Sequence, residues 1–350
     1  MVRSGQTYRQ RLSRSLRLGL LRLATALAVL ALVSGTSTAK ASPPAVSALQ
    51  SPINVKKLGA RGDGLTDDTR AIQRGLDALA KTGGRLYVPA GTYRVGPLYF
   101  PSRVIITGDG DATLLKFRGQ GGFMLSSRPQ PRNLQFVHIR DLSLDMQGKA
   151  DVGIRLARCW HSSVKRVNIY NLPAGTYKAG KVDFPRTGIA ILGAQNRSGA
   201  YYNTLEQCNV FGNAGHYGNS GFYLSSSTED SFQKANFNRL IQCRALYCQV
   251  GINLANGNDN YVEMCEVSNC GTGIRVKSNK NFLAKTYAES CNIGILLEKS
   301  SKYNLVFLTG SLSRTKKAID DKGKNNMLHY KLIDLLKSYN KSTKGLWGLF

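Results

Sequence analysis

Short apolar stretches that alternate with polar residues recur along the chain from about residue 150, and six of them begin with glycine. They read GIRL, GIAI, GFYL, GINL, GIRV and GILL, and they start at Gly153, Gly188, Gly221, Gly251, Gly273 and Gly294. Successive starts lie 35, 33, 30, 22 and 21 residues apart. Alternating stretches of this length predict β-strands, and their regular return predicts a repeat protein.

Asparagine marks a second register with the same period. Its members are Asn203, Asn238, Asn260, Asn281, Asn304 and Asn326, at intervals of 35, 22, 21, 23 and 22 residues. A unit of about 22 residues cannot bury its own apolar face and must stack on its neighbours. Paired helices would need longer stretches of helical period, and the leucine-rich repeat pattern is absent. The repeat therefore predicts an all-β parallel solenoid, in which an asparagine column can hydrogen-bond from coil to coil.

Six cysteines follow this register. Cys208, Cys243 and Cys265 come five residues after an asparagine of the column, and Cys248, Cys270 and Cys291 come ten residues after one. Stacked strands are ~4.8 Å apart, which is wider than the ~3.8 Å Cβ separation of a disulfide. We predict two inward columns of mostly free, buried thiols. Zinc is not expected, because no C-x-x-C is present.

The two ends of the chain differ from the repeat. Residues 1–41 carry an arginine-rich start, an apolar run that ends at Val33, and the sequence Ala39-Lys40-Ala41. This pattern predicts a signal peptide and a secreted, periplasmic or cell-surface protein, with a retained signal anchor as the alternative. No transmembrane segment is expected elsewhere. Residues 332–350 are basic and predict a C-terminal cap or tail, which could cover the last coil or lie on an anionic membrane.

Residues 52–100 predict a cap and a first coil. Ile72, Leu76 and Leu79 have helical spacing, with Thr66 or Asp67 as the N-cap. A strand, a turn and a second strand follow over residues 85–93. The aspartates of this segment suit local turn and cap hydrogen bonds better than catalysis; they are Asp63, Asp67 and Asp68.

Three segments resemble the pectate lyase superfamily: GARGDGLTDDTRAIQ, GGRLYVPAGTYRV and SRVIITGDGDATLL. They are similar to the N-terminal segment of rhamnogalacturonase and epimerase-like proteins and of phage tailspikes. The resemblance implies a single-stranded right-handed parallel β-helix over residues 52–331. It does not decide the chemistry, because this scaffold carries lyases, hydrolases, epimerases and pure binding proteins.

The polygalacturonase branch of the family implies a series of motifs: Asn-Thr-Asp, Asp-Asp, Gly-His-Gly and Arg-Ile-Lys. Only Arg275-Val276-Lys277 resembles a member of that series, and glycoside hydrolysis needs two carboxylates. Arg275 and Lys277 alternate with Val276 and so share one face of a strand. Arginine can hold a sugar carboxylate and lysine can act as a base, which suits β-elimination from a uronate. An ordinary outward basic ladder is the alternative.

The net charge is +27, from 48 basic and 21 acidic residues. Residues 1–41 hold seven basic residues and no acidic one, so 41 basic and 21 acidic residues remain after cleavage, a net charge of +20. Such a surface attracts polyanions. The candidates are nucleic acid, an anionic lipid and an acidic polysaccharide, and export makes nucleic acid the least expected of the three. A solvated basic surface without a specific partner is the alternative.

Three coils are longer than the rest, through insertions at 172–187, 211–220 and 225–237. The first two precede neighbouring strands and should project from one side. They supply the predicted substrate-binding residues, which are Tyr177, Lys178, Lys181, Arg186 and Tyr217. They also supply Asp183 and His216 as a candidate acid and base, which join Lys277 and Arg275 in the predicted catalytic set. No metal site is predicted, although a Ca²⁺ role stays open for Asp109 and Asp111, which a turn between strands also explains.

Three functions remain open at this point. The first is an exported β-helix protein that cleaves or epimerises an acidic polysaccharide, by lyase chemistry in the first instance. The second is a non-catalytic adhesin that only binds such a polymer. The third is a glycoside hydrolase with unusual carboxylates, which would require Asp183 and either Glu206 or Glu229 to lie ~5–10 Å apart.

Overall fold

The computed structural model describes residues 51–129, 133–179, 182–193, 199–213, 218–226, 234–307 and 312–329. All of them belong to one compact unit. Among these residues, no helix has both the length and the apolar character needed to cross a bilayer. The predicted signal peptide and the predicted C-terminal segment 332–350 lie outside the described residues.

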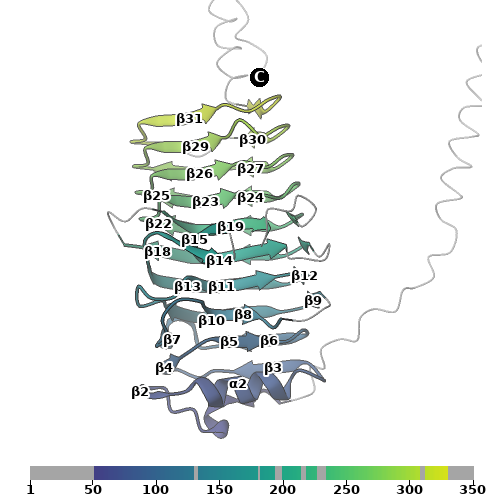
Figure 1. Ribbon diagram of the computed structural model, residues 1–350, viewed down its shortest axis with the longest axis vertical. Helices are drawn as coiled ribbons and strands as arrows, with labels where there is room; N and C mark the ends of the chain where they lie inside the picture. Colours follow the sequence, from purple (N-terminus) through teal and green to yellow (C-terminus); the bar gives the residue numbers. More distant parts are fainter. Residues whose placement is uncertain are drawn as a thin grey trace, which may run out of the picture. The chain divides into compact units, whose positions relative to one another are not determined.

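The strands stack as successive coils, drawn as rungs in Figure 1. A ten-stranded sheet forms one face of the stack. In stacking order it contains β5 (Leu98–Phe100), β8 (Phe123–Ser127), β11 (Val152–Ala157), β15 (Val182–Gly193), β19 (Asn219–Ser226), β23 (Val250–Leu254), β26 (Thr272–Val276), β29 (Ile293–Leu297) and β31 (Lys317–Asp321), and β14 (Thr176–Ala179) pairs with β15. All described pairings in this sheet are parallel except that of β14 with β15.

An eighteen-stranded sheet forms the rest of most coils. Its strands are β1 (Ile53–Asn54), β2 (Asp63–Asp67), β3 (Gly84–Tyr87), β4 (Gly91–Val95), β6 (Val104–Thr107), β7 (Thr113–Phe117), β10 (His138–Asp145), β13 (Ser163–Leu172), β17 (Thr204–Glu206), β18 (Asn209–Gly212), β21 (Arg239–Ile241), β22 (Arg244–Leu246), β24 (Tyr261–Glu263), β25 (Glu266–Ser268), β27 (Phe282–Ala284), β28 (Tyr287–Glu289), β30 (Leu305–Phe307) and β32 (Met327–Leu328). A four-stranded sheet at one corner contains β9 (Leu134–Gln135), β12 (Cys159–Trp160), β16 (Ala200–Tyr201) and β20 (Ala235–Asn236).

The inward side chains fill the interior in columns, as the predicted repeat requires. One such column pairs Ile154, Ile189, Phe222, Ile252, Ile274 and Ile295, all fully buried. The predicted glycine register lies beside it. A Cβ on Gly153, Gly188, Gly221, Gly251 or Gly273 would come within 2.5 to 2.8 Å of the carbonyl oxygen of the next glycine in the column. The strands approach too closely there for any side chain, which explains why the register is glycine. The chain is a parallel β-helix, as predicted.

The asparagine register forms a continuous hydrogen-bonded column. The side chain of Asn238 accepts from the backbone N–H of Asn203 at 3.0 Å and from its amide nitrogen Nδ2 at 2.9 Å. The same pair of bonds recurs from each asparagine to the next, up to Asn326. Five members are at most 1% exposed. The column therefore satisfies backbone groups that each turn would otherwise bury without a partner.

The turns also share an unusual backbone. Many hold a non-glycine residue in the left-handed region, and these residues stack in columns. One column follows the ten-stranded sheet and contains Phe136, His161, Tyr202, Phe237, Asp259, Lys280, Tyr303 and Asn325, with φ between 51° and 58°. We call the turns that carry this column and the asparagine column the asparagine corner. All seven cysteines are free and buried, as the register predicts for six of them.

Helix α2 (Thr69–Ala78) lies at the end of the stack that holds β2 and β3 (Figure 1). Its buried residues include Ile72 and Leu76, and a Cβ on Gly75 would meet Leu86 of β3 at 2.4 Å. The predicted helix is present, and its role as a cap stays a prediction. Short 3-10 turns occur at η1 (Val55–Leu58) and η2 (Gly110–Ala112).

The aspartates of the first coils make the local hydrogen bonds predicted for them. Asp63 accepts from the backbone N–H groups of Leu65 and Thr66, and these bonds lower its pKa to about 2. Asp67 accepts from the Thr69 N–H at 3.1 Å, although the helix N-cap position is Asp68 rather than Thr66 or Asp67. The buried Asp68 carboxylate instead receives the N–H groups of residues 61 and 62.

Candidate functional site

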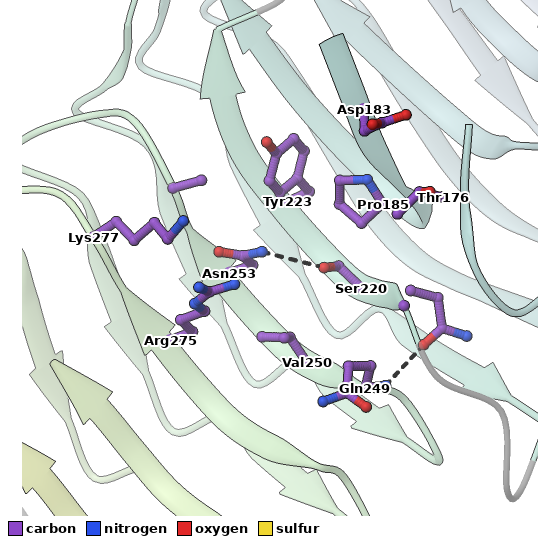
Figure 2. Close-up of a pocket in the computed structure, with 13 residues that line it drawn as sticks. Thr176, Asp183, Pro185, Ser220, Tyr223, Gln249, Val250, Asn253, Arg275 and Lys277 are labelled. Carbon is purple, nitrogen blue, oxygen red and sulfur yellow. Dashed lines mark hydrogen bonds between the residues drawn. The ribbon is translucent and has the colours of Figure 1, made fainter. Parts of the chain in front are cut away.

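A cavity of about 290 Å³ lies on the outward side of the ten-stranded sheet (Figure 2). Strands β19, β23 and β26 form its floor, and the β14–β15 hairpin forms a wall. Its lining residues are Thr176, Asp183, Pro185, Gly218, Asn219, Ser220, Tyr223, Gln249, Val250, Asn253, Ala255, Arg275 and Lys277. In Figure 2, Thr176, Asp183 and Pro185 group together on the hairpin, while Arg275 and Lys277 lie beyond Tyr223 and Asn253.

Strand alternation places the floor residues. Tyr223, Asn253 and Arg275 are register partners on β19, β23 and β26. The next residue on each of these strands points inward and is fully buried. Because side chains alternate along a strand, Lys277 leaves β26 on the same outward side as Arg275. The predicted shared face of these two cations is therefore present.

Arg186 fixes the hairpin that forms the wall. Its Nε lies 3.1 Å from Oδ1 of Asp151, and its guanidinium also donates to the carbonyl oxygen of Ala174 at 3.0 Å. Tyr177 stacks on Phe184 with ring centroids 5.8 Å apart, and Phe184 meets Tyr223 edge-on at 6.4 Å. These contacts hold the hairpin against the sheet.

The two cations of the cavity have different partners. Arg275 pairs with Glu298, whose Oε1 lies 2.7 Å from the arginine nitrogens. Lys277 is exposed, and no described residue forms an ion pair or a side-chain hydrogen bond with its Nζ. Lys277 is therefore the cation of the cavity whose charge is available to a ligand. Asp183 is exposed and is the one carboxylate among the described lining residues.

The floor holds two buried oxygen atoms without a partner. Asn253 is 5% exposed, and its Nδ2 donates to Oγ of Ser220 at 3.3 Å. Its Oδ1 and the Oε1 of Gln249 accept no hydrogen bond from any described group. A buried acceptor without a donor is costly, so these two oxygens favour a ligand that carries hydroxyl groups.

Burial raises the pKa of two tyrosines near the cavity. The pKa of Tyr223 is raised by burial, against the opposing effects of a hydrogen bond with Ser225 and of the Arg275 charge. Burial also raises the pKa of Tyr177 to about 12. Both phenols therefore keep their protons at neutral pH, and Tyr223 can act as a proton donor in the cavity.

The structure brings together part of the predicted set. Asp183, Arg275 and Lys277 line one cavity. Tyr177 packs the hairpin and Arg186 is held in an ion pair at its base, and neither lines the cavity. Lys178 is exposed on β14 but does not line the cavity. The remaining predicted residues lie outside the described residues: Lys181, His216 and Tyr217.

The carboxylate pair required for a hydrolase is not formed by Asp183 and Glu206. Glu206 lies on β17 of the other sheet and pairs with Nζ of Lys165 at 2.6 Å. Glu229 lies outside the described residues. Among the described residues, no cluster of three His, Cys, Asp or Glu side chains could hold a metal ion. The Asp109 carboxylate accepts from the Tyr87 hydroxyl, at 2.9 and 2.8 Å, and from the Ala90 N–H.

The sequence also matches a known family. A family model described as rhamnogalacturonase A/epimerase, pectate lyase-like, matches residues 52–275, well over half of the chain. The chain belongs to this family. The match includes β19 and β23 of the cavity floor and ends within β26 at Arg275, so Lys277 lies just beyond it.

Similar proteins of this pectate lyase-like kind are larger. Alginate lyase 7 of Azotobacter vinelandii is 40% identical over 105 residues, which is 26% of this chain and 12% of the relative. The mannuronan C5-epimerase AlgE5 of the same organism is 50% identical over 66 residues, 16% of this chain and 7% of the relative. The matched segments thus span about a tenth of these relatives.

Solved structures share the fold. ORF18 of Geobacillus virus E2 superposes with a TM-score of 0.59 at 20% identity, over 79% of this chain and 59% of the other. A tailspike protein double mutant of the E. coli bacteriophage HK620, in complex with a pentasaccharide, superposes with a TM-score of 0.57 at 11% sequence identity. The superposition covers 73% of this chain and 49% of the tailspike chain. At these identities the likeness concerns the fold alone.

Proposed function

We propose that this chain binds an acidic, uronate-containing polysaccharide in the cavity and cleaves it by β-elimination. The observation that carries the proposal is the convergence of Arg275, Lys277, Tyr223 and Asn253 on one cavity that holds a single described carboxylate. Hydrolysis by the usual route needs two carboxylates that flank the bond, whereas elimination needs a base, a cation for the sugar carboxylate and a proton donor.

The cavity offers matching partners for a uronate residue. Arg275 can share its guanidinium between Glu298 and the sugar carboxylate, because the guanidinium has five donor hydrogens. The free oxygens of Asn253 and Gln249 can accept hydrogen bonds from sugar hydroxyls. A neutral sugar would satisfy these acceptors but would leave Lys277 without an ion-pair partner. The site therefore favours acidic sugars over neutral ones.

Lys277 and Tyr223 supply the proton transfers of the proposed reaction. Lys277 acts as the base in this step and takes the proton on the carbon next to the sugar carboxylate, so Arg275 alone supplies positive charge to that carboxylate during the step. The electron pair of that C–H bond forms the new C4–C5 double bond, and the bond from C4 to the glycosidic oxygen breaks. The Tyr223 phenol gives its proton to the departing oxygen. Arg275 stabilises the negative charge that develops on the carboxylate during proton removal.

The relatives support the substrate class. Their names, alginate lyase, mannuronan C5-epimerase and, for a 42% identical segment of 69 residues, exo-poly-alpha-D-galacturonosidase of Dickeya chrysanthemi, all refer to polymers of uronic acids. Export of the protein after removal of residues 1–41 is part of the proposal, because such polymers lie outside the cytoplasm.

The test is turnover of defined polyuronates by the purified protein, with a neutral glucan as reference. We expect unsaturated uronate products from at least one polyuronate and none from the glucan. Lys277→Gln should lower kcat by about 10²- to 10⁴-fold. Lys285→Gln is the matched control, because Lys285 is an exposed lysine of the turn between β27 and β28, on the other sheet. New reducing ends without unsaturation would replace the lyase proposal with a hydrolase.

A binding protein without catalysis is the second candidate. It is favoured by one observation: among the described lining residues, no hydrogen bond joins a carboxylate to a candidate base. It predicts salt-sensitive retention on a polyuronate column with no turnover. In that outcome Lys277→Gln would weaken retention, and the catalytic roles of Lys277 and Tyr223 would be discarded.

A further inference from the structure

Three consecutive turns of the asparagine corner carry two lysines each. They connect β26 to β27, β29 to β30, and β31 to β32. We call this set the lysine corner: Lys277, Lys280, Lys299, Lys302, Lys322 and Lys324. All six side chains are exposed. The preceding turn, residues 255–260, contains no lysine, so the series of turns with two lysines each begins after β26.

Few carboxylates balance these charges. Lys322 pairs with Asp320 at 3.3 Å, and no other lysine of the corner forms an ion pair with a described residue. Glu298 is paired with Arg275. Asp321 accepts from the Gly323 N–H and from the Asn326 amide, both at 3.0 Å. Asp259 stands one coil before Lys280 in the left-handed column, without an ion pair to it. Five lysines of the corner therefore form no ion pair with a described residue.

The backbone holds these lysines close together. Lys302 and Lys324 are direct register partners on neighbouring coils. The Lys302 N–H donates to Oδ1 of Asn279 at 2.8 Å, and the Lys280 N–H donates to the Lys302 carbonyl at 3.0 Å. Neighbouring coils are ~4.8 Å apart, so Lys302 and Lys324 place two like charges at about that backbone spacing. Fixed like charges repel, and an anion with a similar repeat would relieve the repulsion.

The lysine corner is continuous with the cavity. Lys277 lines the cavity and is also the first lysine of the corner, and Lys280 follows it within the same turn. A polymer with one residue in the cavity therefore meets the corner as it leaves over β26. Other polyanions could bind the same lysines. The cavity favours a polymer with hydroxyl groups, because its unpartnered oxygens accept hydrogen bonds.

We propose that the lysine corner is a second binding surface for an acidic polysaccharide, which holds polymer residues outside the cavity. The proposal rests on the proposed function for the identity of the polymer. It assigns the cavity to one sugar residue at the reacting bond, and the corner to several residues beyond it. The five lysines of the corner other than Lys277 raise affinity for long chains and take no part in the chemistry.

The test compares a triple variant, Lys280→Gln with Lys302→Gln and Lys324→Gln, with a matched control in which Lys56, Lys57 and Lys81 become Gln. Both triples remove three positive charges from exposed lysines. The substrates are a long polyuronate and a trisaccharide of the same sugar. We expect the corner variant to raise KM for the polymer roughly five- to fifty-fold, with unchanged kcat and a weaker salt dependence of KM. KM for the trisaccharide should stay unchanged in both variants.

The outcomes separate this proposal from the proposed function. If Lys277→Gln abolishes turnover while the corner variant equals the control on the polymer, the corner proposal is wrong and the function stands. If no substrate is turned over but the corner variant alone loses salt-sensitive retention of the polyuronate, the corner stands and cleavage fails. Equal retention of single-stranded DNA and polyuronate by the unmodified protein would also overturn the proposal, since the surface would then not select a polysaccharide.

Discussion

The asparagine corner has two chemically different parts. In the earlier coils, the left-handed position holds Phe136, His161, Tyr202 and Phe237, whose rings stack with centroids 5.8, 5.1 and 5.4 Å apart. In the last described coils the same position holds Asp259, Lys280, Tyr303 and Asn325. The turns of the last three of these coils carry the six lysines of the lysine corner. The backbone is the same in both parts, with a φ of 58° at Tyr202 and 56° at Lys280.

The difference shows what a repeating backbone demands of its side chains. Aromatic rings on neighbouring coils stabilise one another, because each ring lies at stacking distance from the next. Lysines cannot stack in this way, and the register partners Lys302 and Lys324 place like charges on neighbouring coils. The aromatic part is therefore complete within the fold, whereas the lysine part gains from a partner outside it. In both parts a member of the asparagine column follows directly, after Tyr202 and Phe237 in one and after Lys280 in the other.

The largest expected effect comes from breaking that shared column. Asn281→Ala removes the acceptor of the Asn260 backbone N–H and side-chain amide, and the donor to Oδ1 of Asn304. Each buried group left without a partner costs about 1–3 kcal/mol, so we expect a loss of about 3–5 kcal/mol. Guanidinium denaturation measures this loss in the free energy of unfolding. Asn292→Ala, at an exposed position, should change stability by less than about 0.5 kcal/mol; equal losses in the two variants would contradict the role of the column.

A smaller effect separates the two parts of the corner directly. Tyr202→Asn removes ring contacts with His161 and Phe237, and asparagine tolerates the left-handed backbone. We expect a loss of about 1–2 kcal/mol in the free energy of unfolding. Lys280→Asn, at the equivalent position, should change it by less than about 0.5 kcal/mol. A comparable loss at Lys280 would show that the lysines are stabilised within the fold, which would remove the argument for an external partner.

The smallest expected effect is on the stability of the fold at acidic pH, through the carboxylate of Asp320. A hydrogen bond from Lys317, followed by one from Lys322, lowers the pKa of Asp320 below 3.8. Because the folded pKa lies below the unfolded one, this carboxylate stabilises the fold above pH 3.8, and the contribution is lost as the pH falls through the lowered value. Asp320→Asn should therefore flatten the fall of Tm between pH 5 and 2. An unchanged slope in the variant would mean that the carboxylate contributes nothing to the acid dependence.

The columns of the fold could be predicted because spacing alone sets them. A residue type that returns at every coil must lie above its counterpart, and the Asn and Gly registers therefore gave the stacking without any knowledge of the loops. The same alignment also contained part of the site. The second residue after Gly221, Gly251 and Gly273 is the outward column of Tyr223, Asn253 and Arg275, of which only Arg275 was predicted.

The wall of the cavity could not be predicted in this way. The β14–β15 hairpin interrupts the repeat, so no register fixes which of its side chains turn toward the floor. Arg186 was expected to bind substrate, yet it pairs with Asp151, which stands 35 residues earlier in the chain. Local sequence does not contain that partner. The unpartnered oxygens of Asn253 and Gln249 likewise follow from burial, which only the assembled coils determine.

The glycine column also limits how such a protein can change in length. Each of its members faces the carbonyl of the next at a distance that excludes a Cβ, so the strands on either side must keep their register. An inserted or deleted residue within a strand would displace three columns together: the glycine column, the asparagine column and the inward column that runs from Ile154 to Ile295. Duplication of one complete coil of 21 or 22 residues preserves all three. Proteins of this architecture can therefore grow by whole coils, and can vary residue by residue only in the turns, where the hairpin and the lysines are found.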